Sequence, residues 1–189
     1  MGFHTFPLEN AEALEDDARY RFCSREELVE ALDPARVDVV ADLGSGTGFF
    51  TDDVAPFVDT CHAVDVQAGM HGKYREKGVP ENVRLVTAEV GDLPLDDGSL
   101  DAAFSTMTFH EFADPDALTE LRRVLVDGGR LVVVDWSADG MGEDGPPLPE
   151  RYDADGAREL LRDAGFAVRR VTERPETFLV VASAAGRLA

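Results

Sequence analysis

A glycine-rich turn directly after a β-branched run constrains the fold of this chain most. The run VDVVADL, residues 37–43, is typical of a buried strand, and the turn that follows it, residues 44–48, reads GSGTG. Glycines let backbone N–H groups approach a ligand closely, and the next helix presents its positive end to an anion. In an open α/β sheet the ligand crevice lies beyond the carboxyl ends of the strands. The turn therefore predicts an α/β fold with a ligand site at its first strand.

Strand-like and helix-like segments alternate along the rest of the chain. Alternation with short links is typical of a doubly wound parallel sheet, and a hairpin at the end of the chain makes one edge antiparallel. In the N-terminal 35 residues, Ser24 and Glu27 fit a capping box before a helix. The expected strands are residues 37–43, 60–66, 82–88, 100–106, 130–136, 166–171 and 177–182; the expected helices are residues 47–57, 67–77, 153–164 and the segment from Asp114-Pro115 to a stop at Gly128-Gly129.

The charge of the chain is unusual. Its 189 residues include 38 Asp and Glu against 18 Lys and Arg, a formal net charge of −20, and the only lysines are Lys73 and Lys77. Proteins that bind nucleic acid or anionic membranes through phosphates need a basic face, so we expect neither partner. The composition resembles that of cytoplasmic proteins of salt-accumulating halophiles such as haloarchaea, and molar salt, with a Debye length of about 3 Å, would suppress the self-repulsion. The alternative is an ordinary acidic protein.

Targeting and metal-binding patterns are missing from the sequence. The first ten residues contain neither a basic segment nor a long apolar stretch, and no apolar run approaches the roughly 18 residues of a membrane span. Cys23 and Cys61 stand apart, without the Cys/His spacing of a metal site. We therefore expect a cytoplasmic protein with two reduced thiols, no membrane span and no metal; the oligomeric state stays open.

Two carboxylates at strand ends narrow the class of ligand. Asp42 precedes the glycines, and Asp65 ends the second strand 23 residues later, where a carboxylate can accept both hydroxyls of a ribose. Nicotinamide and flavin nucleotide sites normally read GxGxxG, but here Phe49 stands at the sixth position and Gly48 comes one residue early. No Gly-Lys-Ser/Thr follows, which excludes a Walker A loop. A nicotinamide-nucleotide protein is therefore the weaker alternative.

Four motifs, in order along the chain, resemble those of class I S-adenosylmethionine-dependent methyltransferases, specifically the small ubiquinone/menaquinone-methyltransferase-like (type 11) branch. They are VVADLGSGTGFF, HAVDVQAGM, AEVGDLPLDDGSLDAAFS and ELRRVLVDGGRLVVVDW, within a resemblance over about residues 37–181. Glu89 departs from the pattern, because many relatives have Asp there. The resemblance implies a seven-stranded sheet of order 3-2-1-4-5-7-6 with strand 7 antiparallel and helices on both sides. It also implies one domain, residues 1–189, with a short helical lid, 1–36, and a Rossmann-like core, 37–183.

The same resemblance implies S-adenosylmethionine as cofactor, S-adenosylhomocysteine as product and no metal. Asp42 is expected to steady the glycine turn and the ammonium end of the cofactor, and Asp65 to bind its ribose. Ser105, at the end of the fourth strand, is expected beneath the sulfonium. The other expected contacts are Gly44, Ser45 and Gly46 along the methionine moiety, Val66 and Gln67 beside the adenine, and Glu89 and Val90 at the adenine edge.

The acceptor side depends on residues outside these motifs. Methyl transfer from a sulfonium is largely a matter of positioning, and a general base is needed only for a protonated O, N or S or an acidic carbon. His110, in the loop after the fourth strand, titrates near neutral pH, and adjacent Glu111 is a candidate to orient it. The alternative is that both residues only hold the loop.

Further candidates lie at the expected mouth of the crevice. His4 and Phe6 belong to the expected lid, and the alternative for them is a frayed chain end. Trp136 ends the fifth strand and is a candidate wall of the acceptor pocket, with core packing as the alternative. Arg151 is a candidate partner for an anionic substrate, with balance of neighbouring carboxylates as the alternative. The resemblance implies a small-molecule acceptor, although the sequence does not indicate which acceptor or which atom is methylated. The alternative from another class is a non-catalytic S-adenosylmethionine-binding protein, a sensor or a subunit.

Overall fold

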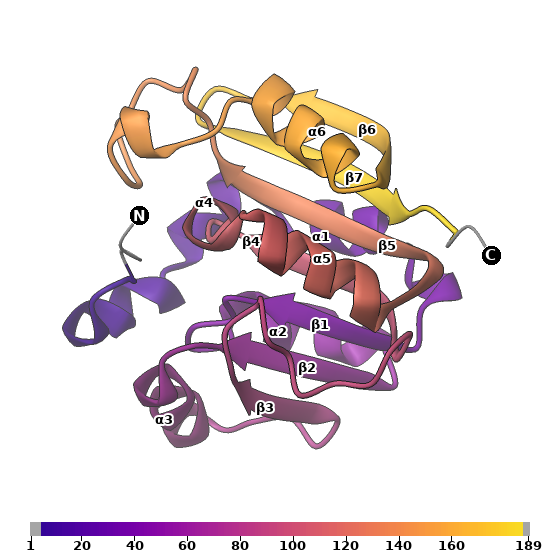
Figure 1. The fold of residues 1–189 in the computed structure, drawn as a ribbon. Helices are drawn as coiled ribbons and strands as arrows, with labels where there is room; N and C mark the ends of the chain where they lie inside the picture. Colours follow the sequence, from indigo (N-terminus) through magenta and orange to yellow (C-terminus); the bar gives the residue numbers. More distant parts are fainter. Residues whose placement is uncertain (1–4, 187–189) are drawn as a thin grey trace.

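Seven strands form one sheet in the computed structural model, which describes residues 5–186 (Figure 1). The strands are β1 Val39–Leu43, β2 Thr60–Asp65, β3 Val83–Thr87, β4 Leu100–Thr106, β5 Leu125–Trp136, β6 Phe166–Glu173 and β7 Thr177–Ala184. They are ordered β3-β2-β1-β4-β5-β7-β6, and β7 runs antiparallel to β5 and β6. The strand order and the antiparallel strand that the family resemblance implies are confirmed.

Within residues 5–186, three of the six α-helices begin where a short polar side chain accepts a backbone N–H of the first turn. Asp114 accepts from Ala117 at 2.8 Å, and Ser24 accepts from Glu27 at 3.2 Å. The Glu27 carboxylate does not complete a capping box, because it pairs with Arg174 before β7. The α-helices are α1 Arg25–Leu32, α2 Phe49–Val54, α3 Ala68–Lys77, α4 Phe109–Phe112, α5 Pro115–Val124 and α6 Ala154–Asp163; the 3₁₀ helices are η1 Leu8–Glu15, η2 Asp17–Arg21, η3 Pro34–Arg36, η4 Ala55–Phe57 and η5 Leu148–Glu150.

The largest difference from the predicted boundaries lies between α5 and β5. The expected helix stop at Gly128-Gly129 is wrong, because α5 ends at Val124 and β5 begins at once with Leu125. Leu125 pairs with Leu100 of β4, and the register shifts before the regular ladder resumes at Arg130. Gly128 has a positive φ of 81°, which suits an irregular turn within a strand as well as it suits the end of a helix. The glycine pair therefore bends β5 and does not terminate α5.

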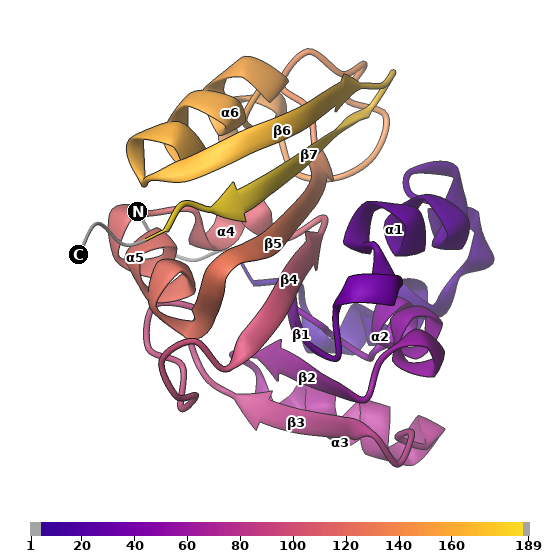
Figure 2. The same ribbon diagram turned by 90° about the vertical axis from the view of Figure 1, so that its right-hand side faces the viewer.

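Two hydrophobic layers hold the helices to the sheet. Figure 2 shows α1, α2 and α3 on one face and α4, α5 and α6 on the other. On the first face Val40 and Phe104 of the sheet are buried with Phe50 of α2, and on the second Leu131 is buried with Leu118 of α5. Apolar residues of the central strands are buried on both faces, as expected of a parallel sheet covered on both sides.

The N-terminal segment, residues 5–22, lies at the end of the sheet where a ligand crevice is expected. In Figure 1 the arrowheads of β1, β2 and β5 point toward the side on which η1 and η2 lie. These carboxyl ends of the parallel strands carry the glycine turn, Asp65 and the loop after β4. Among residues 5–186, no helix is long and apolar enough to cross a membrane.

Candidate cofactor and catalytic site

The glycine turn bends sharply after β1. Gly44, Gly46 and Gly48 have positive φ angles of 77°, 55° and 84°. The N–H groups of Gly44 and Ser45 both donate to the carbonyl of Val64 in β2, at 2.9 and 2.8 Å. A Cβ added to Gly44 would overlap the Thr108 side chain. Residues other than glycine would therefore strain the turn or push aside the loop after β4.

Asp65 joins the end of β2 to the glycine turn. One carboxylate oxygen accepts the Gly46 N–H and the other accepts the Gln67 N–H, each at 2.8 Å. The residue is 8% exposed, and burial raises the pKa of its carboxyl while these two N–H groups oppose that rise. Each oxygen keeps acceptor capacity for a second donor. The geometry thus leaves Asp65 able to accept hydroxyls of a bound ribose.

Three buried polar atoms at the ends of β1 and β4 have no hydrogen-bond partner within residues 5–186: Asp42 Oδ1, Ser45 Oγ and Ser105 Oγ. The other Asp42 oxygen accepts the Thr51 hydroxyl at 2.6 Å, and burial raises the pKa of the Asp42 carboxyl to about 7. Buried polar groups in native proteins are normally paired, so unpaired ones need an explanation. A polar ligand along this edge of the sheet would supply the missing partners.

The remaining predicted cofactor contacts lie on the neighbouring strands. Val66 is 47% exposed, and Gln67 precedes α3 as its N-cap residue. Glu89, after β3, is exposed. Val90 is 7% exposed and belongs to the core on the face of α5. All four are at the carboxyl ends of β2 and β3, and their contacts with a cofactor stay predictions.

His110 is held by a carboxylate that the sequence analysis did not single out. Its Nδ1 lies 3.0 Å from both carboxylate oxygens of Asp135, and its backbone N–H donates to Asp135 Oδ2 at 2.6 Å. The backbone N–H of Trp136 donates to the other oxygen at 2.8 Å. Because a carboxylate only accepts, the Nδ1 atom carries the proton and Nε2 is left as the basic nitrogen. This is the arrangement of a general base with an orienting carboxylate.

The charges around the His110 imidazole favour its role as a proton acceptor. Burial lowers the pKa of His110, but the hydrogen bond and charge of Asp135, with the charges of Glu111 and Glu150, outweigh it and leave that pKa raised. Glu111 Oε1 lies 4.0 Å from His110 Nε2. Burial raises the pKa of Glu111 to about 7, the charge of His110 opposes that rise, and the charges of Asp135 and Asp65 add to it. The pKa of Glu111 therefore depends on the charges of both His110 and Asp65.

The sequence does carry a signal for Asp135. It is the one acidic residue of VVVDW, at the carboxyl end of the fifth strand, so it lies on the same sheet edge as Asp42 and Asp65. Asp135 is fully buried. A charged residue at the end of an otherwise apolar buried strand is a candidate for a functional role.

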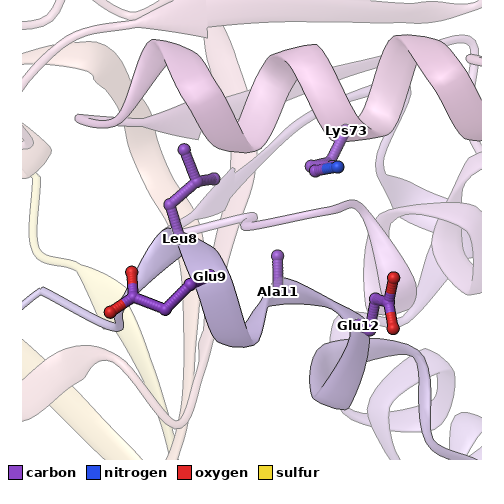
Figure 3. A pocket seen from close by; sticks show the side chains of 5 residues that line it. All are labelled: Leu8, Glu9, Ala11, Glu12 and Lys73. Atoms are coloured by element: carbon purple, nitrogen blue, oxygen red, sulfur yellow. The ribbon is translucent and has the colours of Figure 1, made fainter.

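The N-terminal segment contacts the glycine turn and α3. The ideal Cβ position of Gly46 lies 3.1 Å from Leu14 Cδ1, and the Thr47 hydroxyl donates to the Glu15 carboxylate. Gln67 Nε2 donates to the carbonyl of Phe6 at 3.0 Å. Figure 3 shows Leu8 and Ala11 on the side of η1 that faces α3, at a groove of about 410 Å³ lined by Leu8, Glu9, Ala11, Glu12 and Lys73. His4 lies outside the described residues.

Trp136 and Arg151 pack against each other beside this segment. The ring centroids of Phe22 and Trp136 lie 4.6 Å apart. On the same tryptophan, the guanidinium carbon of Arg151 lies 5.5 Å from the ring centroid. The Arg151 side chain is 1% exposed, pairs with Glu176 at 3.6 Å and donates to the carbonyl of Pro146 at 2.7 Å. The prediction that Arg151 binds an anionic substrate is therefore wrong, because acceptors within the protein already pair with its guanidinium. Trp136 as an acceptor contact stays a prediction.

Sequence comparisons with known proteins find methyltransferases. The family model described as "Methyltransferase domain" matches residues 41–133. The chain is 31% identical over 159 residues to the O-methyltransferase cnsE of Penicillium expansum, covering 75% of this chain and 56% of that protein. It is 30% identical over 152 residues to a demethylmenaquinone methyltransferase of Corynebacterium kroppenstedtii, covering 80% and 61%. Across the first relatives, the chain thus spans about half to three fifths of their length.

A solved structure covers nearly the whole chain. The S-adenosylmethionine-dependent methyltransferase from Aquifex aeolicus superposes with a TM-score of 0.85 at 29% identity, over 95% of this chain and 100% of the other. The fold is thus that of class I methyltransferases, and the chain belongs to the class I S-adenosylmethionine-dependent methyltransferase family.

S-adenosylmethionine is the cofactor of this family, and the residues present fit it. The spare acceptor capacity of Asp65 and the unpaired Asp42, Ser45 and Ser105 atoms together offer partners to a polar, ribose-containing ligand. In the part of the chain that the structure describes, no cluster of three or more His, Cys, Asp or Glu side chains is arranged to hold a metal ion.

Proposed function

We propose that the protein transfers a methyl group from S-adenosylmethionine to a small-molecule acceptor, with His110 as general base. The observation that carries this proposal is the Asp135–His110 pair, which leaves Nε2 as the basic nitrogen beside the carboxyl ends of β4 and β5. The names of similar proteins, an O-methyltransferase and demethylmenaquinone methyltransferases, support an acceptor of small-molecule size.

In this proposal, one set of residues binds the cofactor and another accepts the proton of the acceptor. When bound, the cofactor supplies a methyl group already activated by its sulfonium. The glycine turn and Asp65 position the cofactor, and such alignment contributes about 7–11 kcal/mol toward lowering a barrier. His110 Nε2 accepts the proton that the acceptor loses, while Asp135 stabilises the resulting imidazolium through Nδ1. Glu111 Oε1, 4.0 Å from Nε2, adds a second negative charge beside that cation in its ionised form.

The N-terminal segment completes the crevice in this proposal. Its contacts with the glycine turn and α3 support a lid role for residues 1–36, with His4, Phe6 and Trp136 as acceptor contacts at its edge. Ala11 is the one buried residue of η1, so few apolar contacts oppose its displacement when ligands enter. The lid is the segment of the site expected to differ most between acceptor-bound and acceptor-free protein.

Methyl transfer to a panel of acceptors tests this function. Purified protein is incubated in molar KCl with radiolabelled S-adenosylmethionine and separate phenol, quinol, amine and thiol acceptors, and both S-adenosylhomocysteine and the methylated product are quantified. We expect product with at least one acceptor class, in equal amount to S-adenosylhomocysteine. Tight cofactor binding without transfer to any class would instead support the non-catalytic sensor or subunit.

A further inference from the structure

Arg19 places a positive charge directly over the start of α2. Its Cζ lies 5.1 Å from the ring centroid of Phe49 and 5.0 Å from that of Phe50. Nη1 donates to the carbonyl of Leu14 at 2.6 Å, which holds the side chain against its own segment. Phe49 follows Gly48, the last glycine of the turn. The guanidinium therefore lies at the glycine turn, between the N-terminal segment and the sheet.

This guanidinium has no carboxylate partner, although acidic residues outnumber basic ones by 38 to 18. Within residues 5–186 it forms no ion pair, whereas Arg21 pairs with Asp144 and Arg25 with Asp53. Glu15 is not an ion-pair partner of Arg19. Both Glu15 carboxylate oxygens lie 3.1 Å from Lys77 Nζ, and one of them also accepts the Thr47 hydroxyl. A half-buried cation left unpaired in so acidic a protein indicates an anionic partner that comes from outside the chain.

The complementary unpaired group lies on the same face of the sheet. Asp42 is 1% exposed, and its Oδ1 has no hydrogen-bond partner in the described chain. Its other oxygen accepts from Thr51 of α2, the helix over which Arg19 lies. Burial lowers the pKa of Arg19, and the charges of Asp42 and Glu15 oppose that shift, so the two unpaired groups interact. A cation without an anionic partner and a carboxylate oxygen without a donor together match a zwitterion.

We propose that Arg19 binds the carboxylate of the methionyl group of the cofactor, while Asp42 receives its ammonium group. A guanidinium forms short, charge-assisted and often bidentate hydrogen bonds with a carboxylate. The N-terminal segment thereby supplies half of the amino-acid subsite, and the cofactor itself fixes this segment on the glycine turn. This inference rests on the proposed function, because it takes S-adenosylmethionine as the ligand.

Two ligands that differ only at the amino-acid end test the assignment by calorimetry in molar KCl. S-adenosylhomocysteine carries that end, and 5′-methylthioadenosine has the same adenosyl thioether without it. Arg19→Met keeps an apolar stem over Phe49 and Phe50 but removes the charge. We expect Arg19→Met to weaken S-adenosylhomocysteine binding about 10- to 100-fold and to leave the Kd of 5′-methylthioadenosine within about twofold.

Two further variants separate charge from folding. Arg19→Lys keeps the charge but not the planar fork, so a smaller loss, confined to S-adenosylhomocysteine, is expected. Arg36→Met removes an arginine whose side chain is 81% exposed on η3, and both ligands should bind it as they bind the wild type. Equal weakening of the two ligands by Arg19→Met, or no weakening of either, would overturn the assignment. Wild-type protein that binds neither ligand would overturn the proposed function itself.

Discussion

Replacing His110 with alanine should lower the rate of methyl transfer by about 10²- to 10⁴-fold, the range that a positioned general base contributes. The cofactor Kd should stay within about twofold of wild type, because His110 contacts Asp135 and Glu111 and not the glycine turn or Asp65. The measurement is a single-turnover rate alongside a cofactor titration. An unchanged rate would remove His110 from the mechanism, and an equal loss in rate and affinity would make it a structural residue of the loop.

The pH dependence gives the same prediction a second readout. A histidine base acts in its neutral form, so the rate should rise with pH through the pKa of His110, which lies above its ordinary value of 6.5. Asp135→Asn removes the negative charge that raises this pKa and weakens the hydrogen bond to Nδ1, so the acid limb should move to lower pH while the maximum rate falls. Asp139→Asn, an exposed residue in the loop after β5, is the matched control. An acid limb at the same pH in Asp135→Asn would contradict the pairing.

Replacing Asp65 with alanine should weaken cofactor binding about 100-fold, because two hydrogen bonds to a charged acceptor are lost. The change also leaves the N–H groups of Gly46 and Gln67 without their acceptor, so the glycine turn loses an anchor. Asp65→Asn, which keeps one acceptor oxygen, should show a smaller loss.

The control for this change is Asp59→Ala. Asp59 is exposed and precedes β2 at the opposite end of the strand from Asp65, so the same change in charge there should leave the cofactor Kd unaltered. Thermal unfolding of both variants without ligand separates loss of the fold from loss of the site. An Asp65→Ala protein that binds the cofactor as the wild type does would contradict the ribose assignment.

Features that depend on local sequence were predictable. The β-branched run before GSGTG, the N-caps Ser24 and Asp114 and the terminal hairpin all follow from short-range patterns, and the structure has each of them. The strand order came from the resemblance of motifs to a known family, because periodicity alone does not order parallel strands. Gly128-Gly129 was misassigned because a positive φ serves a helix end and an irregular strand equally well.

The pairings that define the catalytic and amino-acid subsites were not predictable in this way. Asp135 and His110 are 25 residues apart and meet only because β4 and β5 are neighbours in the sheet. Among 38 acidic residues, nothing local to Asp135 shows that it faces an imidazole. Arg19 is similar: its lack of a carboxylate partner is a property of the folded chain, and the sequence shows only another arginine in an acidic protein.

The central claim is that the crevice at the carboxyl ends of β1, β2 and β4 binds S-adenosylmethionine. It is tested most directly by the midpoint of thermal unfolding in molar KCl with S-adenosylmethionine, S-adenosylhomocysteine and NAD in parallel. At about 100 times the Kd, a ligand specific for the folded state adds about 2.7 kcal/mol, which for a domain of this size raises Tm by about 5–10 °C. We expect this rise with the first two ligands and no change with NAD. Stabilisation by NAD alone would contradict the account.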